Sequence, residues 1–118
     1  MSNFPLPDSV RIVGMEYTVN RDVTNLRGDN DQKLLGNIDY CTTTINLSDE
    51  QNLDKAIVVL WHEIVHGIAR TFGVDLNEDD TDRMAHGVHQ VLSDNPILAR
   101  WYLYDLYPCV RNQPEAGS

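Results

Sequence analysis

The chain has 118 residues and a formal net charge of −9, from 18 acidic and 9 basic residues. This length suits one domain with a modest core, and the hydrophobic content of 42% is that of an ordinary globular protein. The acidic balance argues against direct binding to nucleic acid or to anionic membranes, which draws on Lys and Arg. No apolar run approaches the roughly 18 residues of a membrane helix, and the first residues lack the features of a signal peptide.

The two cysteines, Cys41 and Cys109, provide neither a disulfide framework nor a C-x-x-C zinc pair. A reducing, cytoplasmic location is therefore the default expectation. We predict a single domain over residues 1–111. The polar residues 112–118, with Pro and Gly among them, predict a disordered tail.

The first part of the chain predicts β-structure. Its β-branched and alternating segments indicate strands over residues 10–13, 15–19, 34–40 and 42–47. The first two form a short antiparallel pair with a bulge or bend at Gly14. The polar stretch 20–33 predicts a long loop, or a short helix near residues 23–26.

Residues 53–72 predict an amphipathic helix, because their apolar positions recur at spacings of three and four. Those positions are Leu53, Ala56, Ile57, Leu60, Ile64, Ile68 and Phe72. Ser48 and Gln51 have the spacing of a capping box before the helix, and Gly73 is a typical stop after it.

Two further helices are expected. Asn77 can cap a second helix from Glu78 to about Leu92, which the short connection would fold roughly antiparallel to the first. Pro96 opens a third helix that ends before Pro108. The apolar face expected for the second helix consists of Met84, Ala85, Val88, Val91 and Leu92. Together these elements predict an α+β fold, with an antiparallel or mixed sheet of three to four strands packed on three helices.

The sequence His-Glu-Ile-Val-His at 62–66 is an H-E-x-x-H motif. On a helix, His62 and His66 leave the same face one turn apart, a separation that suits two ligands of one Zn²⁺. Glu63 adjoins the first ligand and can act as general base toward a water molecule. The position of the motif inside a well-bounded helix favours a zinc site over two ordinary surface histidines.

A catalytic zinc site usually has a third protein ligand, and the acidic start of the second helix is the natural source. Glu78 and Asp82 lie one turn apart near the expected inward face, so one could bind metal while the other orients a histidine. His89 lies on the same face, where it could be the third ligand or could donate a hydrogen bond to an oxyanion. The sequence leaves these alternatives open.

The run from Asp54 to Ala69, the segment Glu78–Ala85 and the turn Ser93–Pro96 resemble small zincin-type metallopeptidases of phages and mobile elements. These are related to the ImmA/IrrE and SprT-like groups. The resemblance implies a minimal zincin-like fold with the motif on its first long helix. It also implies that His62 and His66 bind Zn²⁺, that Glu63 is the base, and that an acid near Glu78 completes the site.

The chain departs from related groups at two places. Phe72 stands where metzincins have a third histidine, which excludes that subclass. The stretch Asp80–Ala85 replaces the Glu-Ala-Asn pattern that ImmA-type proteins have at this point, so the resemblance does not identify the third ligand.

We therefore expect a zinc metalloendopeptidase that hydrolyses a protein substrate, such as a host or repressor protein, in the cytoplasm of a host cell. The alternative is a non-catalytic protein that uses zinc to hold its helices together and docks on a host or regulatory protein. A third possibility is a zinc-free helical interaction domain. The sequence sets neither the substrate nor the oligomeric state.

Overall fold

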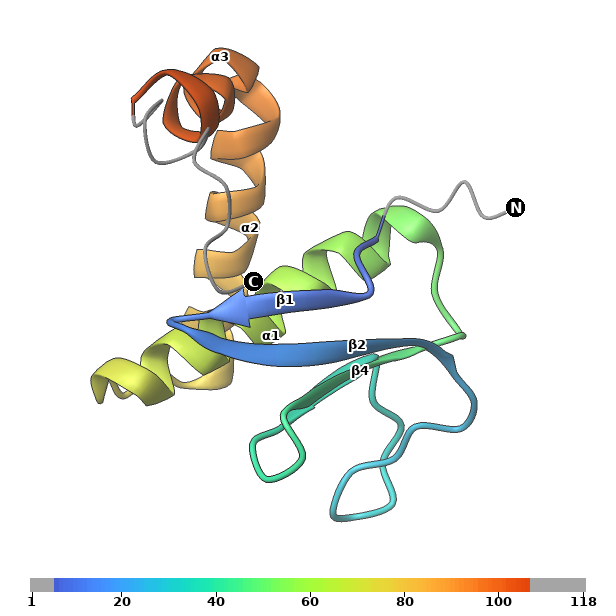
Figure 1. Cartoon of the computed structure of the whole chain (residues 1–118). Coiled ribbons are helices and arrows are strands. Elements are labelled where there is room, and N and C mark those ends of the chain that lie inside the picture. The colour runs from blue at the N-terminus through green and yellow to red at the C-terminus, as the bar shows by residue number, and fades with distance from the viewer. Residues whose placement is uncertain (1–5, 107–118) are drawn as a thin grey trace.

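The computed structural model describes residues 6–106, in which strands come first and helices follow (Figure 1). The predicted α+β class is confirmed, with a four-stranded mixed sheet. The elements are β1 (Ser9–Ile12), β2 (Met15–Val23), β3 (Gly36–Asp39), β4 (Thr44–Ser48), α1 (Leu53–Phe72), α2 (Glu78–Asp94), α3 (Pro96–Arg100) and the π-helical turn η1 (Trp101–Asp105). The predicted tail at 112–118 lies outside the described residues. None of the helices described is long and apolar enough to span a membrane.

The strand order in the sheet is β1-β2-β4-β3, in which only β2 and β4 are parallel. Val13 and Gly14 both have positive φ, 48° and 84°. They form a tight two-residue hairpin turn, so of the bulge or bend predicted at Gly14 the structure has the bend. β2 continues to Val23 because its Asn20 pairs with Asn46 of β4. The predicted loop therefore begins only at Thr24, and no helix forms at 23–26.

One face of the sheet is apolar, and helix α1 lies across it (Figure 1). The residues buried there from the strands are Ile12, Tyr17, Val19, Ile45 and Leu47. The opposite face carries a ladder of amides: Asn20 donates to Asn46, which donates to Asn37. Apolar and polar residues therefore alternate along the strands, as in a sheet that is buried on one face. Only the apolar face packs against α1.

Helix α1 is capped by residues that differ in part from those predicted. The side chain of Asn52 accepts the backbone N–H of Lys55, so Asn52 is the N-cap and the capping box of Ser48 and Gln51 is wrong. The predicted C-terminal stop is confirmed, because Gly73 adopts the left-handed conformation.

The buried face of α1 also differs from the predicted stripe. Leu53, Ile68 and Phe72 are exposed, whereas Glu63 and Gly67 are buried. At Gly67 an added Cβ would lie 2.9 Å from the side chain of Ile12, so the lack of a side chain lets the helix approach the sheet closely. The contact face is therefore the one that carries Glu63.

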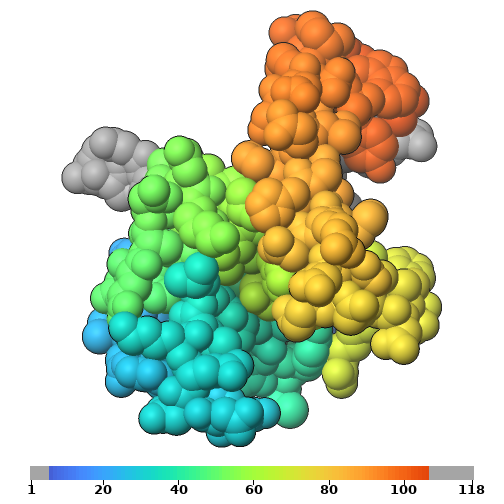
Figure 2. Space-filling model, turned by 180° about the vertical axis from the view of Figure 1, so that it is seen from behind, coloured from blue at the N-terminus to red at the C-terminus, as the bar shows by residue number. Residues whose placement is uncertain are grey.

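Helix α2 begins at the predicted cap, where Asn77 accepts the backbone N–H of Asp80. It does not fold back along α1 as expected. It rises away from α1, and only Thr81 and Ala85 are buried along its length (Figure 1). Of the predicted apolar face of α2, Val88 is half-buried, whereas Met84, Val91 and Leu92 are exposed. The end of the described chain projects beyond the rest of the molecule (Figure 2).

Candidate metal centre

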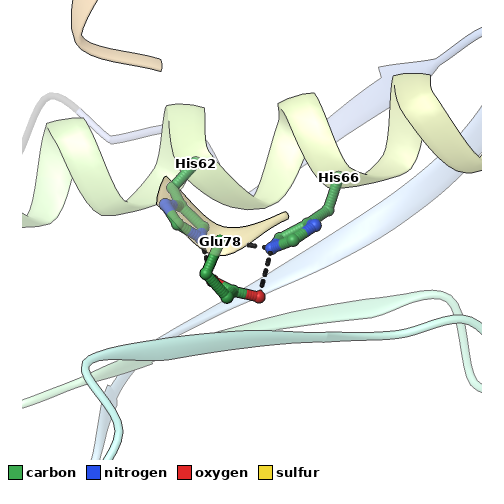
Figure 3. A group of neighbouring side chains, drawn as sticks. All are labelled: His62, His66 and Glu78. Carbon is green, nitrogen blue, oxygen red and sulfur yellow. Dashed lines mark hydrogen bonds and ion pairs between the residues drawn. The ribbon is translucent and has the colours of Figure 1, made fainter. Parts of the chain in front are cut away.

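Three side chains converge where the middle of α1 meets the start of α2 (Figure 3). His62 Nε2 lies 2.9 Å from Glu78 Oε1, and His66 Nε2 lies 3.1 Å from Glu78 Oε2. The two Nε2 atoms are themselves 3.1 Å apart. The i, i+4 spacing on α1 accounts for the pair of histidines, and the Asn77 cap fixes the helix start that presents Glu78.

The bonding within this triangle depends on which of its atoms carry hydrogen. If both Nε2 atoms carry hydrogen and donate to Glu78, no acceptor remains for the contact between the two nitrogens. Burial lowers the pKa of His66, outweighing the opposite effect of Glu78, so this imidazole favours its neutral form. A neutral imidazole offers the lone pair that metal binding requires.

The donor set fits a zinc ion. Zn²⁺ prefers nitrogen and oxygen ligands at about 2.0–2.1 Å, and a tetrahedral arrangement then separates the ligand atoms by about 3.3 Å. The two Nε2 atoms, 3.1 Å apart, are close to that separation. Glu78 faces them with different oxygens, and with one ligand atom from each residue the three donors lie within 4.8 Å of one another. Two imidazoles and one carboxylate also match the ligand sets of catalytic zinc sites.

Asp82 takes the supporting position that the sequence offered as one of two choices. Its Oδ1 lies 3.3 Å from His62 Nδ1, on the ring nitrogen opposite the one that faces Glu78. A carboxylate placed there fixes the tautomer in which Nε2 carries the lone pair. The structure therefore brings Glu78 to the centre and places Asp82 behind His62.

Glu63 is 5% exposed and lies on the sheet side of α1. Burial raises the pKa of its carboxyl from 4.5 to about 7, although the nearby His62 acts in the opposite direction. A carboxyl with this pKa can both accept and release a proton near neutral pH.

A cleft of about 490 Å³ opens over the centre. Its walls come from the segment before β3, from β3 itself and from the two helices, and it is lined by Gln32, Leu34, Gly36, Asn37, Ile38, Tyr40, His62, Glu63, His66 and Glu78. The β3 wall was not predicted from the sequence. A glycine inside a predicted strand was the one available signal, since it often marks a close approach of the backbone.

Tyr40 joins this cleft just beyond the end of β3. Burial raises the pKa of its phenol, and Arg70, whose guanidinium lies 4.1 Å from the ring centroid, only partly offsets that rise. The phenol therefore keeps its proton at neutral pH and can donate a hydrogen bond into the cleft.

Gly36 lets β3 pack against the motif helix. A Cβ on this residue would lie 2.5 Å from Val59 Cγ1 and 3.4 Å from Glu63 Oε2. We expect Gly36→Ala to destabilise the fold by about 1–3 kcal/mol through overpacking. Chemical denaturation of dilute protein measures the change.

Gly87→Ala is the matched control, because a Cβ there meets no heavy atom within 4 Å. In a helix interior this change should stabilise by about 0.5–1 kcal/mol. Equal effects of the two substitutions would contradict the close approach at Gly36.

His89 does not join the centre. It lies about 16 Å along the axis of α2 from Glu78, and it is not among the residues that line the cleft. The structure therefore offers no support for His89 as third ligand or as oxyanion donor, and Tyr40 occupies the cleft instead. The cause is the direction of α2, which carries its later turns away from α1.

Comparison with known proteins adds no assignment. No protein-family model matches the chain, and no match was found among the curated proteins or the solved structures.

Proposed function

We propose that this chain is a zinc-dependent endopeptidase whose ion is held by His62, His66 and Glu78. The observation that carries the proposal is the convergence of these three donors beside the buried carboxyl of Glu63, at the floor of a cleft. A structural zinc site is usually closed by four protein ligands. A three-donor group that faces a cleft instead leaves room for water and substrate.

When bound, zinc supplies Lewis acidity, which lowers the pKa of water toward neutrality and polarises a carbonyl group. Glu63 takes the proton of the attacking water as the oxygen bonds to the peptide carbonyl carbon. It then delivers that proton to the leaving amine as the C–N bond breaks. The Tyr40 phenol is placed to donate to the carbonyl oxygen, which gains negative charge during the attack.

The position of β3 supports a peptide as substrate. β3 is at the end of the strand order and pairs with β4, while no strand in the described part of the chain pairs with its other edge. An extended peptide can add to such an edge through main-chain hydrogen bonds. Gly36, Asn37 and Ile38 of this strand line the cleft, so a peptide paired there would run past the histidines.

The first test is the zinc content of the protein purified without chelator, measured by elemental analysis. We expect about one zinc per chain, lost in His62→Ala and retained in His89→Ala. His89→Ala is the matched control because it removes an imidazole outside the centre. No zinc in the wild type would overturn the proposal.

Zinc binding alone does not separate a peptidase from the non-catalytic zinc protein considered above. The second measurement is therefore cleavage of an unfolded protein such as denatured casein, with and without chelator. Chelator-sensitive cleavage that is lost in His62→Ala supports the peptidase. A zinc-loaded protein that cleaves no unfolded chain would favour the binding protein instead.

A further inference from the structure

We call residues 83–106 the helical arm; it consists of the last twelve residues of α2 together with α3, η1 and Leu106. Among the helices and strands, α3 and η1 pack only on α2 and on each other. Figure 2 shows the arm in orange, standing clear of the rest of the molecule. The arm therefore contributes little to the core that the sheet and α1 enclose.

The arm carries an apolar surface that residues 6–106 leave exposed. Two neighbouring hollows of about 430 Å³ each share Leu92. The first is lined by Arg83, Met84, Gly87, Val88, Val91 and Leu92. The second is lined by Leu92, Leu98, Ala99, Tyr102 and Leu103. Arg83 is the one charged residue in either lining.

Three more large side chains of the arm, Ile97, Trp101 and Tyr104, line neither hollow, and we call them the ridge. They follow one another at spacings of four and three residues along α3 and η1. Their exposed fractions are 77%, 44% and 65%. The arm thus carries both apolar hollows and apolar side chains able to fill them.

The exposed apolar area matches what a stable dimer needs. Nine large apolar residues of the arm are between 37% and 77% exposed. At about 150–250 Å² for a large side chain, their exposed parts amount to roughly 900 Å². A standard protein interface buries about 800 Å² on each partner, so the arm as a whole exposes apolar area of the size that specific association requires.

The charge of the arm is compatible with a second copy as the occupant. The whole chain has a net charge of −9, but the arm contains Arg83 and Arg100 against Asp94 and Asp105, and is therefore neutral overall. Two copies can meet through their arms while their acidic bodies stay apart.

We propose that the protein is a homodimer in which two arms pack across a two-fold axis. In such an interface each copy presents the same surface, so the ridge of Trp101 and Tyr104 in one copy fills the hollows around Leu92 and Leu98 in the other, and the reverse. Leu92 lies about 21 Å along α2 from Glu78. The dimer therefore leaves the cleft and the metal centre open, and the proposal does not depend on peptidase activity.

The test is the mass of the full chain in solution, measured by sedimentation from about 1 to 100 µM. We expect the wild type to have twice the chain mass of 13.4 kDa. Leu98→Asp should weaken the dimer about 100-fold, because it places an unpaired charge inside the interface. Ile97→Glu should weaken it as well, and with its side chain 77% exposed it disturbs the arm least.

Phe72→Glu is the matched control, because Phe72 is a large apolar side chain that is 65% exposed but lies at the end of α1, outside the arm. It should dimerise as the wild type does. Circular dichroism checks that each variant keeps its helices, and if Leu98→Asp loses helix, Ile97→Glu decides.

A monomeric wild type at about 100 µM would overturn the proposal, whatever else covers the arm. So would dimerisation of Ile97→Glu as tight as that of the wild type. The salt dependence of dimerisation is a second test. Salt screens the repulsion between the two acidic bodies, so the dissociation constant of the dimer should stay constant or fall as the salt concentration rises. Dissociation in high salt would contradict an apolar interface.

Discussion

Replacing Glu63 by glutamine is expected to abolish nearly all peptide hydrolysis, by about 10²–10⁴-fold in kcat, while zinc stays bound. The amide keeps the size of the carboxyl but cannot accept the proton of water at neutral pH. His62, His66 and Glu78 are untouched, so zinc content should remain that of the wild type. Hydrolysis of a peptide substrate and elemental analysis on the same samples measure the two quantities.

Glu16→Gln is the control for the same chemical change. Glu16 lies on β2, and its side chain is exposed beside Arg11. It should leave hydrolysis unchanged. Turnover by Glu63→Gln at the wild-type rate would remove Glu63 from the mechanism, whereas loss of zinc in that variant would assign it a structural role at the centre.

The folding stability of Glu63→Gln shows whether a loss of activity comes from the missing base or from a damaged fold. In metal-free protein the carboxyl of Glu63 has a pKa of about 7, against 4.5 without burial. The unfolded chain therefore releases this proton first, and stability falls as the pH rises from about 4.5 to 7. At pH 8 the full cost is about 3 kcal/mol. Glu63→Gln carries no such charge, so it should be at least as stable as the wild type at pH 8.

The elements that local sequence controls were predictable. The i, i+4 spacing of His62 and His66 requires only that their segment be helical, and the apolar period indicates that it is. Asn77 caps the start of α2 and Gly73 ends α1 through hydrogen bonds and backbone conformation close to them in sequence, so these two helix ends were also predictable. The α+β class followed from the order of strands and helices.

The predictions that were wrong concern the packing of helices and strands against one another. The direction of α2 is set by which side chains fit against α1, and only Thr81 and Ala85 fit. The apolar period of α2 was real, but it predicted burial within one chain, which the structure does not provide. In the same way, the burial of Glu63 follows from the approach of β3 at Gly36, a contact between segments distant in sequence.

The choice of the third ligand depended both on local spacing, which was predictable, and on the packing of α2 against α1, which was not. Local spacing indicated that Glu78 and Asp82 share a face, but it did not say which of them reaches the histidines. The start of α2 lies beside α1, so Glu78 contacts both Nε2 atoms while Asp82 reaches only the far nitrogen of His62. His89 shared the same predicted face, and the rise of α2 carries it away.

This geometry predicts a graded loss of metal. Glu78→Ala removes the carboxylate whose two oxygens each contact one histidine. We expect zinc affinity to fall about 10³-fold or more, since the loss of a partner behind a ligand alone costs about 10–100-fold. Asp82→Asn removes such a supporting partner, so its effect should lie in that smaller range. Competition with a chelator of known zinc affinity measures both.

Asp79→Ala provides the baseline for this series, because Asp79 is an exposed acid of the same first turn of α2 that belongs to neither contact. If zinc responds only to the acidity of the helix start, all three substitutions should act alike. If Glu78 is a ligand, its loss must exceed that of Asp82, and Asp79 must have almost no effect. The reverse order, with Asp82 dominant, would make Asp82 the ligand and Glu78 its support, and would require α2 to rotate on α1 when the ion binds.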